Sequence, residues 1–270
     1  MKKVILLTSG ELRHDFFRMY IALQPGITVI RSYCESIEKN LVSKIKNTDV
    51  SSLRYKHLQA REQTEKDFFE EFVAYNEDKT QPVHITKGAI NDAVIVQDII
   101  NLSPDLIISY GCSIIKAPLI EAFPDRFINI HLGLSPYYRG SGTNYWPFVN
   151  NEPEYCGVTF MNIDTGIDTG KVIHQIRPDM YPLDTFHVIC NRLLIKSFKT
   201  CASLINQYDR LISMPQIKDS NKDKIYKNAM FDESSVEMLY SRFRESGIAN
   251  YLRDKKQRDL LVPIIENSAL

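Results

Sequence analysis

Residues 127–170 are the most informative part of this sequence and read FINIHLGLSPYYRGSGTNYWPFVNNEPEYCGVTFMNIDTGIDTG. The stretch opens with an apolar segment, residues 127–130, that we expect to be a buried strand before a loop rich in Gly, Ser and Pro. Asn129 and His131 are two residues apart, so on a strand their side chains point the same way. A later loop places Asp164 and Asp168 between glycines. An amide, an imidazole and a carboxylate that converge at strand ends are the groups that acyl-group chemistry requires.

The sequence on both sides of this stretch predicts an α/β fold with a doubly wound, mostly parallel sheet. Apolar runs bounded by turn residues alternate with amphipathic segments, which is typical of repeated strand–helix units. In such a sheet, ligands bind at the carboxyl ends of the strands. The expected strands are residues 3–8, 27–32, 82–86, 106–109, 156–162 and 171–176. The expected helices are residues 12–23, residues 91–101 with Asn91 as the cap, residues 114–123, and a long helix capped by Asp184 or Thr185.

The expected organisation is one large domain over residues 1–213 and a small C-terminal extension over residues 214–270, with a helix at about 234–253. A charged helical insertion is expected at about residues 35–80. Its apolar stripe, made by Phe68, Phe69, Phe72 and Val73, predicts a solvated helix that docks on the sheet. The alternative is a partner or dimer surface, and both this helix and the C-terminal helix are candidate contacts of a homodimer.

The composition describes an ordinary globular protein with no bias toward nucleic acid. Lys+Arg and Asp+Glu both number 33, and 44% of the residues are hydrophobic, so no basic surplus points to nucleic acid or to an anionic membrane. The five cysteines are scattered and form no C-x-x-C pair, which favours reduced thiols in a cytoplasmic protein. The first apolar run ends at Gly10 and reads as a strand rather than a signal peptide.

The turn after the first predicted strand could hold an anion. Gly10, Arg13 and His14 would lie at the N-terminus of the first helix, where backbone N–H groups and the helix dipole favour negative charge. The alternative is a plain strand–helix turn, because one glycine is not a Gly-rich fingerprint. We find no spacing of histidines, cysteines and carboxylates that predicts a metal site.

The central stretch also resembles a known family. The matching features are Asn129-Ile-His131, Pro136 followed by Arg139-Gly140, Gly157-Val-Thr159, and Asp164-x-Gly-x-Asp168-Thr-Gly170. With them, residues 110–170 resemble the catalytic domain of the folate-dependent formyltransferases, which act on methionyl-tRNA, glycinamide ribonucleotide or sugar nucleotides. The resemblance implies that residues 1–213 are a formyltransferase catalytic domain and that Asn129, His131 and Asp168 are catalytic.

The resemblance further implies 10-formyltetrahydrofolate as the co-substrate and no metal. The family's folate site wraps around two loops, which here contain Ser113, Ile114, Ile115, Ile163, Asp164, Thr165, Gly166 and Ile167. Apolar side chains with nearby backbone amides suit a flat heteroaromatic ring. For the isoleucines, ordinary packing is the alternative. Acceptor-side candidates are Tyr137 and Arg139, in addition to the three residues of the predicted anion site.

One departure from the family pattern is the loop Gly133-Leu134-Ser135-Pro136, where the family usually has Ser-Leu-Leu-Pro. The loop is expected to keep its fold but to lose any contribution from the first serine.

The expected activity is transfer of a formyl group to a primary amine of a small molecule, with an amino sugar on a nucleotide as the favoured acceptor. A tRNA acceptor is not expected, because only residues 215–270 follow Met214 and they carry no strong basic surplus. The alternatives are a formyltetrahydrofolate hydrolase, an enzyme like methionyl-tRNA formyltransferase but without the tRNA-binding domain, and a catalytically idle folate or nucleotide sensor.

Overall fold

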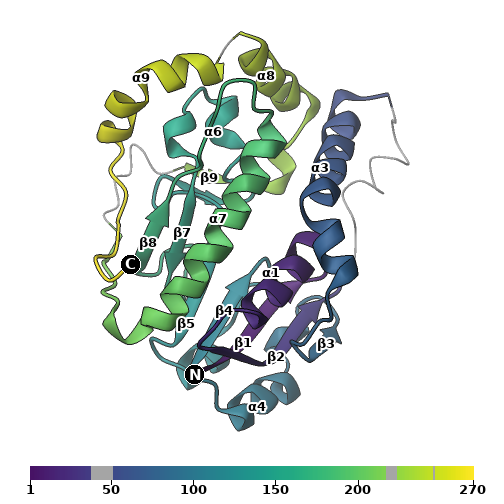
Figure 1. Cartoon of the computed structure of the whole chain (residues 1–270), viewed down its shortest axis with the longest axis vertical. Coiled ribbons are helices and arrows are strands. Elements are labelled where there is room, and N and C mark those ends of the chain that lie inside the picture. Colours follow the sequence, from purple (N-terminus) through teal and green to yellow (C-terminus); the bar gives the residue numbers. More distant parts are fainter. Residues whose placement is uncertain (38–50, 217–223, 246) are drawn as a thin grey trace.

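The computed structural model describes residues 1–37, 51–216, 224–245 and 247–270. The predicted insertion at residues 35–80 therefore lies partly outside the described residues. No helix in these four ranges is long and apolar enough to cross a membrane. Figure 1 shows a layered molecule in which helices cover a central sheet, with α8 and α9 at the end away from α4.

The sheet has seven strands in the order β3-β2-β1-β4-β5-β7-β8. The five neighbouring strands β3, β2, β1, β4 and β5 are parallel, and β7 runs antiparallel to both of its neighbours, β5 and β8. The predicted mostly parallel α/β sheet is therefore confirmed. A separate two-stranded sheet pairs β6 with β9. The bounds are β1 (Lys2–Ser9), β2 (Ile27–Glu35), β3 (Pro82–Ile85), β4 (Leu106–Tyr110), β5 (Phe127–His131), β6 (Tyr138–Gly140), β7 (Val158–Met161), β8 (Val172–Ile176) and β9 (Lys224–Tyr226).

Helices flank both faces of the sheet and bury two cores. Side chains alternate along β1, so Val4 and Leu6 pack with α1 and α7 on one face, while Ile5 and Leu7 pack with α4 and α5 on the other. The α-helices are α1 (Leu12–Ala22), α3 (Leu53–Tyr75), α4 (Ala93–Leu102), α5 (Ala117–Ala122), α6 (Trp146–Val149), α7 (Phe186–Gln207), α8 (Glu233–Arg244) and α9 (Gly247–Leu261), and the short 3-10 helices are η1 (Ala89–Asn91), η2 (Pro153–Tyr155), η3 (Tyr208–Arg210) and η4 (Asn228–Met230).

Helix α3 lies against α1, α7 and α8, over the layer of helices, and projects to the side of the sheet (Figure 1). Phe69 is fully buried, while Phe68, Phe72 and Val73 are partly buried and pack against the main core. Ser52 caps the helix by accepting a hydrogen bond from the backbone N–H of Tyr55. The predicted apolar stripe therefore docks, but mainly on other helices rather than on the sheet.

Three helix predictions need correction. The predicted helix over residues 114–123 begins only at Ala117, where Pro118 in the first turn suits a helix start. The single C-terminal helix is two helices, because α8 ends at Arg244 and α9 begins at Gly247. The break falls next to Gly247, and glycine is the residue type, after proline, that most weakens a continuous helix. Asp92, and not Asn91, occupies the N-cap position of α4.

Candidate active site

The candidate site lies at the carboxyl ends of β4 and β5 and in the loops that follow them. Ser109 and Asn129 are register partners on these neighbouring parallel strands. The hydroxyl of Ser109 donates to Oδ1 of Asn129 across 2.8 Å. An amide carries its acceptor on one side and its two donors on the other. Ser109 therefore occupies the acceptor side of the amide and leaves the Nδ2 hydrogens for other partners.

His131 ends β5 and is buried between two acceptors. Its Nδ1 lies 3.3 Å from Oδ1 of Asp168, and its Nε2 lies 3.0 Å from the carbonyl oxygen of Tyr138. A carbonyl oxygen only accepts, so Nε2 must carry the proton that it donates to Tyr138. The imidazole is thus held from both sides and is oriented by the carboxylate.

Asp168 has a separate partner for each carboxylate oxygen. Oδ1 faces His131, while Oδ2 accepts from the backbone N–H of Gly140 across 3.1 Å. The residue has a positive φ of 51°, a strained conformation for which Asp is one of the better-tolerated residues. Strain of this kind persists where the surroundings fix the backbone, and here the backbone oxygen of Asp168 accepts from Gln216 across 2.9 Å.

A cavity of about 150 Å³ opens beside these side chains and lies between the loops that follow β4 and β7. Asn129 and Asp168 both line the cavity. His131 does not line it and contacts it only indirectly, because its Nδ1 faces the carboxylate of Asp168. Of the predicted folate-site residues, seven line the cavity and Thr165 does not: the seven are Ser113, Ile114, Ile115, Ile163, Asp164, Gly166 and Ile167.

The chemistry of the lining fits a flat heteroaromatic ring with polar edges. Ile114 and Ile167 are exposed large apolar side chains at this cavity, and an apolar pocket with a few placed polar groups is the usual form of a small-molecule site. Burial, reinforced by Glu35, raises the pKa of the Cys112 thiol to about 12, so this lining side chain stays uncharged near neutral pH. At about 150 Å³ the cavity is smaller than the usual pocket for a drug-sized ligand, so a folate tail would extend beyond it.

Two polar side chains that the sequence did not assign to the site hold the loop after β4. Both oxygens of the buried carboxylate Glu35 accept from backbone N–H groups, one from Ser113 at 2.7 Å and one from Gly88 at 2.9 Å. Asn91 donates to the carbonyl oxygen of Ile114 at 3.0 Å and accepts from the N–H of Lys116 at 2.8 Å. Asn91 therefore orders this loop, and that role replaces its predicted role as a helix cap.

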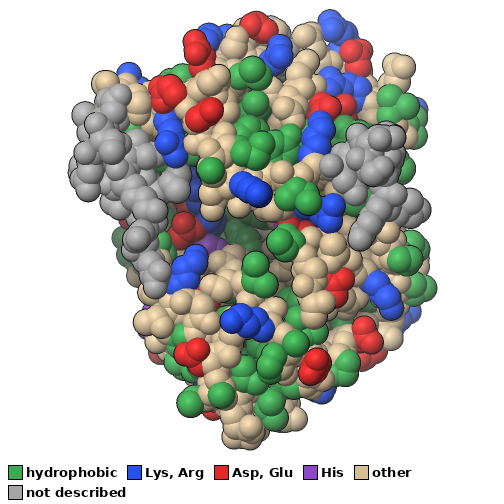
Figure 2. Space-filling model, turned by 180° about the vertical axis from the view of Figure 1, so that it is seen from behind, with side chains coloured by type: hydrophobic (Ala, Val, Ile, Leu, Met, Phe, Trp, Pro, Cys, Tyr) green, Lys and Arg blue, Asp and Glu red, His purple; other side chains and the backbone are tan. Residues whose placement is uncertain are grey.

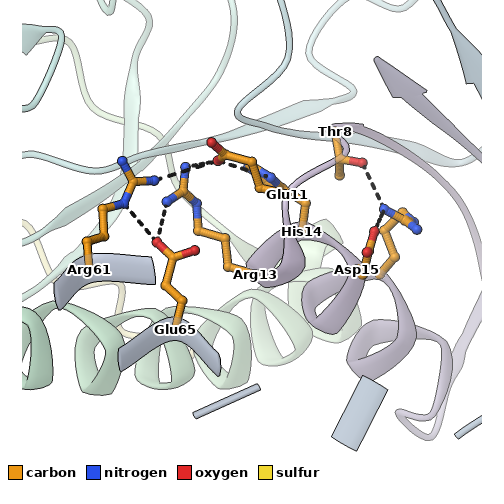
Figure 3. Close-up of polar contacts among 8 residues, drawn as sticks. Thr8, Glu11, Arg13, His14, Asp15, Arg61 and Glu65 are labelled. Carbon is orange, nitrogen blue, oxygen red and sulfur yellow. Dashed lines mark hydrogen bonds and ion pairs between the residues drawn. The ribbon is translucent and has the colours of Figure 1, made fainter. Parts of the chain in front are cut away.

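The predicted anion site has a different arrangement. Figure 3 shows Arg13 between Glu11 and Glu65, with Arg61 of α3 beside them. Arg13 donates to Glu65 across 2.7 Å and also to Glu11. An anion at Gly10 would compete with these carboxylates for Arg13, so the geometry disfavours the predicted anion site. The cluster joins α1 to α3 instead.

His14, the third residue of that prediction, is buried next to Gly111. Burial, followed by the charges of Arg13 and Arg18, holds the pKa of His14 well below its usual value, so the ring is neutral. Gly111 has a φ of 70°, and a Cβ there would lie 2.3 Å from Nε2 of His14. Only glycine allows this approach. Because Gly111 lines the cavity, the imidazole ring of His14 lies directly behind this part of its wall.

The remaining two acceptor candidates are chain neighbours of Tyr138 and Gly140, whose backbone groups contact His131 and Asp168. Tyr137 and Arg139 flank Tyr138 on the segment that contains β6, and neither belongs to the cavity lining that the described residues form. The ring of Tyr137 packs edge-on against Tyr155.

A hollow is visible near the middle of the molecular face in Figure 2, with acidic and histidine side chains at its edge.

Comparisons with known proteins agree with this architecture. A sequence model of the family described as "Formyl transferase" matches residues 42–203, which is more than half of the chain. The chain therefore belongs to the formyl transferase family, the folate-dependent enzymes that its central motifs resemble.

The chain is similar to relatives and solved structures from several branches of this family. It is 31% identical over 183 residues to a methionyl-tRNA formyltransferase of Desulforamulus reducens, covering 67% of this chain and 56% of that protein. The chain thus spans about half the length of the curated relatives it matches. Two solved structures share its fold. Glycinamide ribonucleotide transformylase 1 from Symbiobacterium toebii has 17% identity and a TM-score of 0.54, over 81% of this chain and 95% of that one. An N-formyltransferase from Helicobacter canadensis has 17% identity and a TM-score of 0.55, over 86% of this chain and 72% of that one.

Proposed function

We propose that this protein transfers the formyl group of 10-formyltetrahydrofolate to a primary amine. The observation that carries the proposal is the cavity in which the amide of Asn129 and the carboxylate of Asp168 both face the same space. One group can donate a hydrogen bond and the other can accept a proton. These are the two needs of acyl transfer to an amine.

In the proposed reaction, the folate supplies the formyl carbon and leaves as tetrahydrofolate after the amine attacks. Nδ2 of Asn129 donates to the formyl oxygen as negative charge develops there, because Ser109 already occupies Oδ1. Asp168 accepts the proton that the amine loses, directly or through a water. The leaving nitrogen of the folate takes up one proton as the amine loses one, so the transfer causes no net gain or loss of protons.

His131 supports Asp168 from the buried side. Its Nδ1 faces the carboxylate, and an imidazolium there would satisfy both the carboxylate and the Tyr138 carbonyl oxygen. A direct hydrogen bond from Nε2 to the formyl oxygen would require His131 to leave Tyr138. We therefore assign His131 to proton transfer with Asp168 and leave oxyanion stabilisation mainly to Asn129.

An amino sugar on a nucleotide is the favoured acceptor. The equal numbers of basic and acidic residues give no general attraction for a polyanion, and the structure from Helicobacter canadensis holds folinic acid and dTDP-3-aminofucose. Methionyl-tRNA is the second candidate, because the relatives matched over the longest stretches are methionyl-tRNA formyltransferases. It requires contacts from outside the small cavity.

The test measures release of tetrahydrofolate from 10-formyltetrahydrofolate with no acceptor, with a panel of nucleotide-linked amino sugars, and with methionyl-tRNA. Release that depends on one amino sugar supports the proposal. Dependence on methionyl-tRNA assigns the second acceptor. Release that is independent of every acceptor identifies a hydrolase, and no release under any condition contradicts the proposed activity.

A further inference from the structure

Both His131 and Asp168 are held by the backbone of one short strand. The carbonyl oxygen of Tyr138 faces Nε2 of His131, and the N–H of Gly140 donates to Oδ2 of Asp168. Tyr138 and Gly140 are the first and last residues of β6. The relative placement of the imidazole and the carboxylate therefore depends on where this three-residue strand lies.

Within the described residues, the only strand paired with β6 is β9, from the C-terminal extension. The two strands run parallel, with Tyr138 opposite Lys224 and Gly140 opposite Tyr226. The N–H of Lys224 donates to the carbonyl oxygen of Tyr137 at 2.8 Å, and the N–H of Ser141 donates to that of Tyr226 at 2.9 Å. Hydrogen bonds at both ends thus fix β6 against β9.

The fit between the two strands depends on one glycine. Gly140 has a φ of 91°, and a Cβ there would lie 2.3 Å from the carbonyl oxygen of Tyr226. Because backbone cannot shift as a flexible side chain can, any larger residue would push β9 away. The residue that donates to Asp168 is therefore also the residue that allows β9 to approach.

The ring of Tyr226 holds β9 in place. It stacks on Tyr138 at 5.5 Å with an interplanar angle of 2°, and on Trp146 at 4.5 Å with an angle of 13°. The amide of Asn150 donates to its hydroxyl across 2.8 Å. Stacked aromatic pairs are stabilising beyond their buried area. Tyr226 therefore packs β9 against both β6 and α6.

The extension also holds the other side of the Asp168 loop. Nε2 of Gln216 donates to the backbone oxygen of Asp168 at 2.9 Å and to that of Gly170 at 2.8 Å. Just before it, Met214 pairs with Val172 of β8 through two backbone hydrogen bonds. Two separate parts of the extension, Gln216 and β9, therefore contact the segments that carry the candidate catalytic groups.

We propose that Gln216 and β9 form a C-terminal brace that sets the geometry between His131 and Asp168, with Gln216 and Tyr226 as positioning residues. The inference rests on the proposed function, because it assigns the extension a part in that same reaction. Of the two loops of the predicted folate site, the loop after β4 is held by Glu35 and Asn91 instead. Loss of the brace should therefore lower turnover by a larger factor than it lowers folate affinity.

The first test uses Gln216→Met, which keeps the length of the side chain and removes both donated hydrogen bonds. A misplacement of about 1 Å in a catalytic constellation can cost about 10²-fold in rate, and we expect kcat to fall about 10-fold or more. The Kd for the folate should change by a smaller factor than kcat, because the loop after β4 keeps its own supports. Gln63→Met, on the exposed side of α3, is the matched control and should behave like the parent.

The second test uses the pair Tyr226→Leu and Tyr226→Phe. Leucine removes the stacked ring, while phenylalanine keeps it and loses only the hydrogen bond from Asn150. We expect Tyr226→Leu to lower kcat and Tyr226→Phe to restore most of it. Tyr75→Leu, at an exposed ring, controls for the substitution itself. A loss of kcat that matches a loss of folded protein, measured by thermal unfolding, would assign a structural role only.

A readout that needs no activity separates this inference from the proposed function. The ¹⁵N chemical shifts of the His131 ring report its tautomer and hydrogen bonds, and the signal is assigned by its loss in His131→Asn. We expect these shifts to move in Gln216→Met and Tyr226→Leu and to stay fixed in both controls. Unchanged shifts overturn the brace even if the parent transfers formyl groups, and moved shifts support it even if the parent proves inactive.

Discussion

The hydroxyl of Ser109 lies 2.8 Å from Oδ1 of Asn129, across two neighbouring parallel strands. This hydrogen bond turns the donor side of the amide away from β4. The orientation of the group that we assign to the oxyanion is therefore fixed by a residue of another strand. That relationship leads to two linked predictions.

Replacing Asn129 by Ala should lower kcat by about 10²–10³-fold, which is the effect of removing one oxyanion donor. The Kd for tetrahydrofolate should remain nearly unchanged, because the predicted folate loops do not depend on this amide. Steady-state kinetics and a binding titration check both values. Asn101→Ala, on α4 and away from the site, is the control, and an Asn129→Ala enzyme of near-parental turnover would contradict the role.

Replacing Ser109 by Ala should lower kcat by a smaller factor, about 10-fold, because the amide remains but is no longer held. In an Asn129→Ala background, the same change should have almost no further effect, since its target is gone. A double-mutant cycle measures this coupling. Additive effects of the two substitutions would show that Ser109 acts by another route.

Replacing Glu35 by Gln should weaken folate binding about 10-fold and leave kcat at saturating folate close to the parental value. The carboxylate accepts from two backbone N–H groups, and an amide can accept from only one of them and presents donors to the other. Asn91→Ala acts on the same loop and should produce the same pattern. Glu70→Gln, exposed on α3, is the control. A fall in kcat with an unchanged Kd would refute this division of roles.

Acid should destabilise the interface of α3, α7 and α8 through two buried histidines. The rings of His57 and His187 lie 4.6 Å apart, and burial lowers the pKa of His57 to about 4 and that of His187 to about 3. The unfolded chain takes up protons below pH 6.5, the ordinary value, while the folded chain does not. Stability is therefore full above pH 6.5 and falls as the pH drops toward 4.

The expected loss from His57 alone is on the order of 3 kcal/mol, since one pKa unit corresponds to about 1.4 kcal/mol. Urea unfolding at a series of pH values measures the slope between pH 6.5 and 4. His57→Phe should flatten it, whereas His84→Gln, at an exposed position, should not. An unchanged slope in His57→Phe would place the acid sensitivity elsewhere.

Periodicity and turn residues were sufficient to predict most of the sheet. The strands around residues 3–8, 106–109 and 127–130 appear as β1, β4 and β5, and the predicted long helix appears as α7, whose apolar side chains are buried. These features depend on local patterns of apolar residues that repeat with the period of a strand or a helix. The family motifs predict the two loops that line the cavity.

The supports of the site could not be predicted in the same way. Glu35 lies 78 residues from the N–H group of Ser113, and Gln216 lies 48 residues from Asp168. Their roles arise from contacts between distant segments, for which a single sequence carries no periodic signal. The predicted cap role of Asn91 is wrong for the same reason, because its side chain bonds to Ile114 and Lys116 instead of capping its own helix.

The most direct test of the proposed function follows the labelled formyl carbon of 10-formyltetrahydrofolate in the presence of each candidate amine, with the parent protein and with Asp168→Asn. We expect the label to appear as a formamide on a nucleotide-linked amino sugar with the parent, and to remain on the folate with Asp168→Asn. Label that appears only as formate, or that reaches the acceptor equally well with Asp168→Asn, would contradict formyl transfer by this site.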